Sequence, residues 1–173
     1  MNETMKTILE RRSVRNFTKE PISEEILNNL VDAAMHAPSG MCRKTWKFTV
    51  ITNSEIIKRL VETIKKVLNR EVYDMYSPTA IIIPSNERDS VWGRDDNACA
   101  LQNIFLAAHS FGVGSVWINQ LSTICDEPEI RALLSELEIP ENHIVYGIAA
   151  LGIPDKTATE RPYREIGEVK FFK

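Results

Sequence analysis

Residues 95–111, DDNACALQNIFLAAHSF, place the strongest limit on how this 173-residue chain can fold. The apolar residues of this stretch recur at helical spacing and cover well over half of the helix circumference; they are Ala98, Leu101, Ile104, Phe105, Ala108 and Phe111. A helix on the surface of a globular protein has a narrower apolar stripe. We therefore expect this helix to lie at the centre of the fold or in an interface.

The remaining segments alternate between helical and extended patterns. Helices are predicted near residues 4–12, 23–38, 54–70 and 127–137, and strands near residues 46–52, 80–84, 112–118 and 143–151. Such alternation by itself favours a parallel, doubly wound sheet. The first predicted strand, however, is not followed by a glycine-rich phosphate loop. An anion site, if there is one, must therefore lie elsewhere in the chain.

The C-terminal stretch IGEVKFFK, residues 166–173, is extended and aromatic. Little chain is left to cover its apolar side chains, whose exposure to water is unfavourable. We therefore expect this tail to pack on another subunit.

Length and composition predict a single domain, residues 1–173, and exclude several classes of function. A net charge of -3 does not favour nucleic-acid binding, although it leaves room for a local anion site. The longest apolar run, residues 144–151, is far shorter than the ~20 residues that span a bilayer. The chain shows no secretory signal and an odd number of widely spaced cysteines, so we expect a cytoplasmic protein. Its histidines lack metal-site spacing, and no metal is expected.

Residues 11–17, RRSVRNF, gather positive charge directly after the first predicted helix. Near the other end of the chain, Arg161 and Arg164 stand in a proline-broken loop. Guanidinium groups bind phosphate through paired N–H donors, so the two clusters could meet on one phosphate. The commoner explanation is surface charge, with the first cluster complementing the dipole of a helix C-terminus. The residues alone leave both interpretations open.

Two loops of small residues also have two interpretations. Residues 37–46, APSGMCRKTW, could let the backbone approach a flat ligand, but a helix end followed by a turn is the simpler explanation. In residues 112–120, GVGSVWINQ, Gly112 and Gly114 are typical of a helix C-cap and turn, and Trp117 is typical of a core residue. Asp95 and Asp96 are interpreted as first-turn acids that complement the helix dipole.

In their order and spacing these segments resemble the nitroreductase family of flavin-dependent oxidoreductases, in its short-chain branch. The landmarks cover nearly the whole chain: RRSVRNF, APSG-x-x-x-x-TW-x-F-x-VI, NACALQNIFLAAHSFGVGSVW, LGIP and the terminal R-x-x-R-x-x-x-EV. The resemblance implies an α+β fold with a central mixed or antiparallel sheet wrapped by helices. It also implies an intertwined homodimer that exchanges C-terminal tails and binds FMN at the interface. Both the tail and the helix at 95–111 would then be buried against the second subunit.

The resemblance also assigns roles to residues at matching positions. Arg11, Arg12 and Ser13 would hold the FMN phosphate and ribityl chain. Arg15 would lie near the N1/C2 edge of the flavin, where reduced FMN gathers negative charge. The other residues implied in the cofactor site are Pro38, Ser39 and Gly40 from the second subunit, Trp117, Ile118 and Asn119 beside the ring, and Arg161 and Arg164 at the phosphate.

Two departures from the family pattern affect these assignments. Cys42, Lys44 and Thr45 replace the family's asparagine, glutamine and proline, so none of the three is assigned as a ligand. The terminal K-x-R-R pattern is also changed, which leaves open whether Arg161, Tyr163 or Arg164 reaches the phosphate.

The implied function is a ping-pong reaction. NADH or NADPH would reduce FMN and leave, and an electron-poor acceptor such as a nitro compound or quinone would then take two electrons. No catalytic acid or nucleophile is expected from the protein, because the cofactor carries the chemistry. Two alternatives stay open: a relative that uses reduced flavin for dehalogenation or enone reduction, and a flavin-binding or flavin-sensing protein with little turnover.

Overall fold

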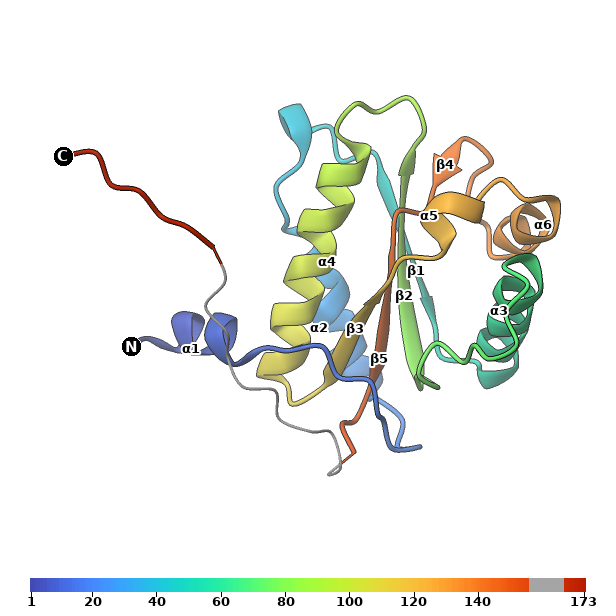
Figure 1. Cartoon of the computed structure of the whole chain (residues 1–173), viewed down its shortest axis with the longest axis horizontal. Coiled ribbons are helices and arrows are strands. Elements are labelled where there is room, and N and C mark those ends of the chain that lie inside the picture. The colour runs from blue at the N-terminus through green and yellow to red at the C-terminus, as the bar shows by residue number, and fades with distance from the viewer. Residues whose placement is uncertain (156–166) are drawn as a thin grey trace.

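The structure of the chain is a computed structural model that describes residues 1–155 and 167–173. Helices cover both faces of a single sheet (Figure 1). The helices are α1 (Glu3–Glu10), α2 (Glu24–Met35), the 3-10 turn η1 (Gly40–Cys42), α3 (Ser54–Val67), α4 (Gly93–Ser110), α5 (Leu121–Ile124) and α6 (Pro128–Glu136). The strands are β1 (Trp46–Ile51), β2 (Ala80–Glu87), β3 (Gly114–Ile118), β4 (His143–Ile144) and β5 (Ile148–Gly152).

The sheet is antiparallel at every pairing of the named strands. Its order is β1-β2-β5-β3, and the short β4 pairs with the end of β2. The parallel sheet that alternation alone favours is therefore wrong, and the α+β fold with an antiparallel sheet is confirmed. The physical reason lies after α3: residues 68–79 carry the chain back, so β2 starts beside the end of β1, with Ile81 opposite Ile51.

Two apolar cores lie on the two faces of the sheet. Helices α2 and α4 cover one face, and α3, α5 and α6 cover the other (Figure 1). Strand β2 supplies both cores, because successive side chains of a strand point to opposite faces. Ile81 and Ile83 join the core under α3 and α6, whereas Ile82 joins the core under α4.

Helix α4 lies at the centre of the second core, as its wide apolar stripe predicts. It packs on α2 and on the face of the sheet, and Leu101 and Ile104 have no exposed surface. Most of its apolar stripe is therefore buried within a single chain. A second subunit is therefore not needed to bury most of this helix.

Some element boundaries match the sequence-based expectations and others differ. Helix α2 begins as predicted, because the Ser23 hydroxyl accepts a hydrogen bond from the Ile26 N–H at 3.3 Å. Helix α3 is capped by Asn53, whose side chain accepts from the Glu55 and Ile56 N–H groups. Strand β2 continues past Pro84 to Glu87, and the strand expected at 143–151 is split into β4 and β5.

The described part of the C-terminal tail, residues 167–173, runs away from the body of the chain (Figure 1). Its three apolar side chains face solvent, and Phe171 and Phe172 are 77% and 91% exposed. In the part of the chain that the structure describes, no helix is both long and apolar enough to cross a membrane.

Candidate functional site

The arginine segment, residues 11–17, runs along the edge of the sheet. Helix α1 ends at Glu10 and Arg11 is its C-cap, so a helix dipole does not account for Arg12 and Arg15. The segment then follows β3, where the Val14 N–H donates to the Ser115 carbonyl at 2.9 Å. Ser13 and Ser115 form an isolated parallel bridge. The segment is thus fixed beside the strand that carries Trp117.

Two apolar residues anchor the arginine segment where glycines leave space for them. A Cβ atom on Gly114 would lie 2.9 Å from Val14 side-chain atoms, and one on Gly152 would lie 2.6 Å from the Phe17 ring. Gly114 is therefore a buried strand residue that makes room for Val14, and its interpretation as a turn residue is wrong. With Val14 and Phe17 turned inward, Arg12 and Arg15 remain exposed.

The cationic groups of the arginine segment have no acidic partner among the described residues. No carboxylate there forms an ion pair with Arg11, Arg12 or Arg15. The guanidinium carbon of Arg15 lies 5.7 Å from the centre of the Tyr76 ring, which is cation–π geometry. Unpaired guanidinium groups beside an exposed serine hydroxyl are suited to holding an anion such as a phosphate.

The second group of expected site residues forms the 38–44 turn, which includes η1. The turn is fixed to the first helical turn of α4 by Asp96. One carboxylate oxygen of Asp96 accepts from the Ser39 hydroxyl at 3.0 Å, and the other accepts from the Gly40 N–H at 2.8 Å. Asp95 is exposed, as a first-turn acid would be, but Asp96 is 4% exposed. Asp96 is a first-turn acid as interpreted, and it also bonds the 38–44 turn, which the sequence did not predict.

A second contact of the 38–44 turn involves Trp92. A Cβ atom on Gly40 would lie 2.4 Å from the Trp92 ring, so only glycine lets the turn approach this closely. The Lys44 N–H donates to the Ser39 hydroxyl at 2.9 Å and closes the turn from the other side. Sequence reasoning missed Trp92 and Asp96, because neither residue belongs to a recognisable local motif.

The residues that depart from the family pattern lie in or next to this turn. Met41, Cys42 and Lys44 all have positive φ, between 49° and 60°, which is unusual for residues other than glycine. The Thr45 hydroxyl donates to the Asn86 side-chain oxygen at 2.6 Å. Thr45 therefore ties the start of β1 to β2, and Cys42 is an exposed free thiol.

Residues 117–119 lie at the end of β3, an edge strand of the sheet. Trp117 is 38% exposed, and its ring centroid lies 6.1 Å from that of Phe105. Gly147 gives it space, since a Cβ atom there would lie 2.4 Å from the indole nitrogen. Ile118 is buried, so only its backbone can meet a ligand on the open side, whereas Asn119 is exposed.

The arginine segment and the 38–44 turn lie at opposite ends of α4 (Figure 1). The turn is bonded to Asp96 at the start of the helix, and Val14 packs on Gly114, just beyond its end. With 18 residues at about 1.5 Å each, α4 is roughly 27 Å long. A single chain therefore does not bring these two groups together. Arg161 and Arg164, like Tyr163, lie outside the described residues.

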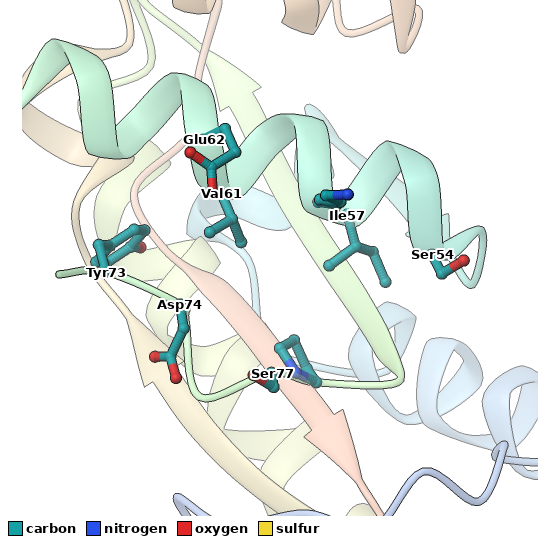
Figure 2. Close-up of a pocket in the computed structure, with 9 residues that line it drawn as sticks. Ser54, Ile57, Val61, Glu62, Tyr73, Asp74 and Ser77 are labelled. Carbon is teal, nitrogen blue, oxygen red and sulfur yellow. The ribbon is translucent and has the colours of Figure 1, made fainter.

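A separate pocket lies between α3 and the segment before β2 (Figure 2), and contains none of the expected site residues. Its volume is about 270 Å³, and Ile57 and Val61 point into it from α3. Burial raises the pKa of Tyr73 to about 12, so its hydroxyl stays neutral, at 3.4 Å from the Gln120 side-chain oxygen. We assign no chemistry to this pocket, which holds no charged side chain that is buried.

Comparisons with known proteins show the family to which the chain belongs. The sequence profile of the nitroreductase family matches residues 8–153. A putative NADH dehydrogenase/NAD(P)H nitroreductase of Archaeoglobus fulgidus is 34% identical over 160 residues, covering 89% of this chain and 87% of the relative. The NADPH-flavin oxidoreductase of Vibrio harveyi is 30% identical over 173 residues, with coverage of 94% and 70%.

Solved structures show the same fold. A nitroreductase with bound FMN from Bacteroides fragilis is 40% identical with a TM-score of 0.94, and both chains are covered completely. A second nitroreductase with bound FMN, from Desulfitobacterium hafniense, is 25% identical with a TM-score of 0.84, covering 98% of this chain and 100% of the other. The expected nitroreductase-like fold is confirmed, and the chain belongs to the nitroreductase family.

Proposed function

We propose that this chain is an FMN-dependent NAD(P)H oxidoreductase that works as a homodimer, with FMN at the subunit interface. Two electrons pass by a ping-pong mechanism from NADH or NADPH to an electron-poor acceptor such as a nitro compound or a quinone. The names of its relatives support the cofactor and the donor, since they include an NAD(P)H nitroreductase, an NADPH-flavin oxidoreductase and nitroreductases with bound FMN.

One observation carries the proposal of a shared site. The arginine segment and the 38–44 turn stand at opposite ends of the 18-residue helix α4. Both groups match cofactor-binding segments of the family, yet one chain holds them too far apart to meet on one FMN. In a two-fold dimer, the turn of one copy can face the arginine segment of the other. Each FMN then takes its phosphate contacts from one chain and the turn from its partner.

Exposed apolar surface supports the dimer. Met5, Ile8 and Leu9 of α1 are each between 44% and 48% exposed. In the tail, Phe171 and Phe172 are exposed to a greater extent. Large apolar side chains left exposed on one face of a helix, as on α1, are typical of surfaces that another chain covers. We propose that α1 and the exchanged tail are buried when two copies assemble.

The residues present fit FMN. Arg11, Arg12 and Ser13 offer donors for the phosphate and the ribityl chain that no carboxylate of the described residues pairs with, and Arg15 is an exposed cation for the flavin edge. Trp117 on β3 and Asn119 just after it have exposed side chains for the ring, whereas the buried Ile118 would contribute through its backbone. We also propose Pro38, Ser39 and Gly40 as the partner's segment, and Arg161 and Arg164 as further phosphate contacts.

The protein's part in the reaction is to bind, orient and set the electrostatics. Bound FMN supplies the chemistry, which is hydride acceptance from NAD(P)H and two-electron transfer to the acceptor. Arg15 places a fixed positive charge where negative charge develops on reduction, which stabilises the reduced state. Trp117 is 38% exposed, and we propose that a flat donor or acceptor approaches the flavin beside it. No side chain is required as a nucleophile or proton donor. We also propose that the protein works in the cytoplasm.

The visible spectrum of the purified protein tests this function. We expect a yellow protein whose flavin absorbance bleaches under anaerobic conditions on addition of NADH or NADPH. Adding a nitroaromatic compound or a quinone should then restore the absorbance. A bound flavin that neither nicotinamide reduces would favour a flavin-binding or flavin-sensing protein. Reduction without recovery would point to another acceptor, such as a halogenated aromatic or an enone.

A further inference from the structure

Asp96 is a buried carboxylate that the proposed chemistry does not use. It is 4% exposed, and within the described parts of the chain no cation forms an ion pair with it. Burying a charge costs free energy unless hydrogen bonds compensate it. Both carboxylate oxygens of Asp96 accept from the 38–44 turn, one from the Ser39 hydroxyl and one from the Gly40 N–H. The hydrogen bonds that compensate the burial of Asp96 therefore come from this turn.

The 38–44 turn needs such an external tie because its backbone is strained. Met41, Cys42 and Lys44 have positive φ, although none of them is a glycine. Strained residues of this kind keep their conformation only where the surrounding structure holds them. The contact between Gly40 and Trp92 and the two hydrogen bonds to Asp96 provide that hold.

The same hydrogen bonds define what Ser39 can do. A serine hydroxyl has one hydrogen to donate, and Ser39 donates it to Asp96. The hydroxyl oxygen already accepts from the Lys44 N–H at 2.9 Å. The donor of Ser39 is thus not free for a cofactor, and neither is the Gly40 N–H. In this conformation the side chain of Ser39 shapes the turn.

We propose that Asp96 is a positioning residue that holds the partner-facing 38–44 turn in the shape that meets FMN, through Ser39 and Gly40. The inference rests on the proposed function, because it concerns the cofactor of that same site. Asp96 does not touch the cofactor itself. It acts by keeping the Ser39–Gly40 backbone in place across the subunit interface.

Titration of FMN into flavin-free protein, followed by quenching of flavin fluorescence, tests the proposal. Asp96→Asn replaces one carboxylate oxygen by an NH2 group, which then faces either the Ser39 hydroxyl or the Gly40 N–H, both donors to Asp96. We expect the Kd for FMN to rise about tenfold or more. The matched control is Asp95→Asn, which removes the same charge from the same turn of α4 but is exposed. It should leave the Kd within about twofold of the wild-type value.

Two further measurements separate positioning from general stability. The Ser39→Ala variant should raise the Kd in the same direction, and its effect should shrink in the Asp96→Asn background, since the two residues share one hydrogen bond. Thermal unfolding of each flavin-free variant shows whether it is folded. If Asp96→Asn does not fold, Ser39→Ala decides the question, because it keeps the bond to Gly40.

The outcomes distinguish this inference from the function on which it rests. If wild-type protein takes up no FMN, the proposed function fails and the inference fails with it. If wild-type protein binds FMN and the folded Asp96→Asn and Ser39→Ala variants bind it equally well, only the positioning role is overturned. A rise in Kd that is equal for Asp95→Asn and Asp96→Asn would also overturn it, because charge alone would then explain the effect.

Discussion

The arginine segment and the 38–44 turn are both loops after a helix, but they are built in opposite ways. The arginine segment is fixed through backbone bonds and two inward apolar residues, Val14 and Phe17. Arg12 and Arg15 are exposed, and no carboxylate in the described part of the chain pairs with the segment's arginines. In the turn, the polar groups of Ser39 and Gly40 are already bonded to Asp96. The first loop presents free donors, whereas the second presents a fixed surface.

This difference supports the proposal that the two loops contribute to cofactor binding in different ways. Free guanidinium groups gain energy from an anion that arrives, because charge-assisted hydrogen bonds are the strong ones. A strained turn that is already tied down contributes shape, because little further order is lost when a ligand meets it. Substitutions in the two loops should therefore differ in kind as well as in size.

The largest expected effect is that of Arg11→Ala on FMN affinity. Hydrogen bonds to charged groups contribute about 1.5–3 kcal/mol, so the Kd for FMN should rise by about ten- to hundredfold. Fluorescence titration measures this, and added salt should reduce the difference between variant and wild type. The control is Arg59→Ala, which removes an exposed arginine of α3 that pairs with Glu136. An equal loss in both variants would mean that the arginine segment is ordinary surface charge.

The next effect compares the anchors of the two loops. Gly40→Ala should push the turn off Trp92, and Gly152→Ala should displace Phe17, which anchors the arginine segment to the sheet. Overpacking of this kind costs about 1–3 kcal/mol, to be measured by denaturant unfolding of each flavin-free variant. Both should also weaken FMN binding, since each displaces one half of the site. Wild-type stability in either variant would show that the close contact is not maintained.

A smaller effect is expected from Arg15→Ala, and on a different property. Loss of a cation near the flavin should make reduction harder and lower the midpoint potential by roughly 20–40 mV, equivalent to about 1–2 kcal/mol. FMN affinity should change far less than in Arg11→Ala. Dye-equilibrated anaerobic titration gives the potential. If the two arginine variants shift potential and affinity alike, the division of roles within the arginine segment is wrong.

The smallest effect concerns the pH dependence of stability that His143 of β4 produces. The Ser85 hydroxyl oxygen lies 3.0 Å from His143 Nδ1. The next residue, Asn86, accepts the hydrogen bond from Thr45. Burial lowers the pKa of His143 from its ordinary value of 6.5, against the opposing effect of Glu87. Below pH 6.5 the unfolded chain binds a proton at His143 that the folded chain excludes. His143 therefore has no effect on the free energy of unfolding above pH 6.5 and lowers it as the pH falls below that value.

The measurement for His143 is the unfolding free energy as a function of pH. We expect the decline below pH 6.5 to be shallower in His143→Gln than in wild type. Because His143 pairs with the end of β2, whereas the arginine segment pairs with β3, binding of the FMN phosphate should stay unchanged over the same range. An unchanged slope in the variant would show that other groups dominate.

Local patterns in the sequence predicted a large part of this fold. Helical periodicity placed α4 at the centre, and Ser23 marked the start of α2, because both signals depend on neighbouring residues. The direction of the strands was not predictable from alternation, because it depends on how residues 68–79 return the chain. The roles of Gly114 and Gly152 were missed for a related reason, since they depend on the arrival of Phe17 and Val14 from far along the chain.

The candidate site was predicted unevenly for the same reason. The resemblance assigned both loops to the cofactor site from their sequence motifs, and in the structure Arg12, Ser13 and Arg15 are exposed. Asp96, however, bonds a residue 57 positions away and stands beside a second aspartate that is exposed. No pattern of neighbours distinguishes the two acids, because their difference arises only when the turn packs on α4.

The shared site is the central claim, and mixed dimers test it most directly. Arg11→Ala and Gly40→Ala chains are refolded together, so that half of the dimers contain one chain of each kind. If each FMN uses the arginine segment of one chain and the turn of the other, every mixed dimer has one intact site, and about a quarter of all sites should recover wild-type FMN affinity. If both loops of one chain served the same FMN, no site in the mixture would be intact, and the absence of recovery would contradict the account.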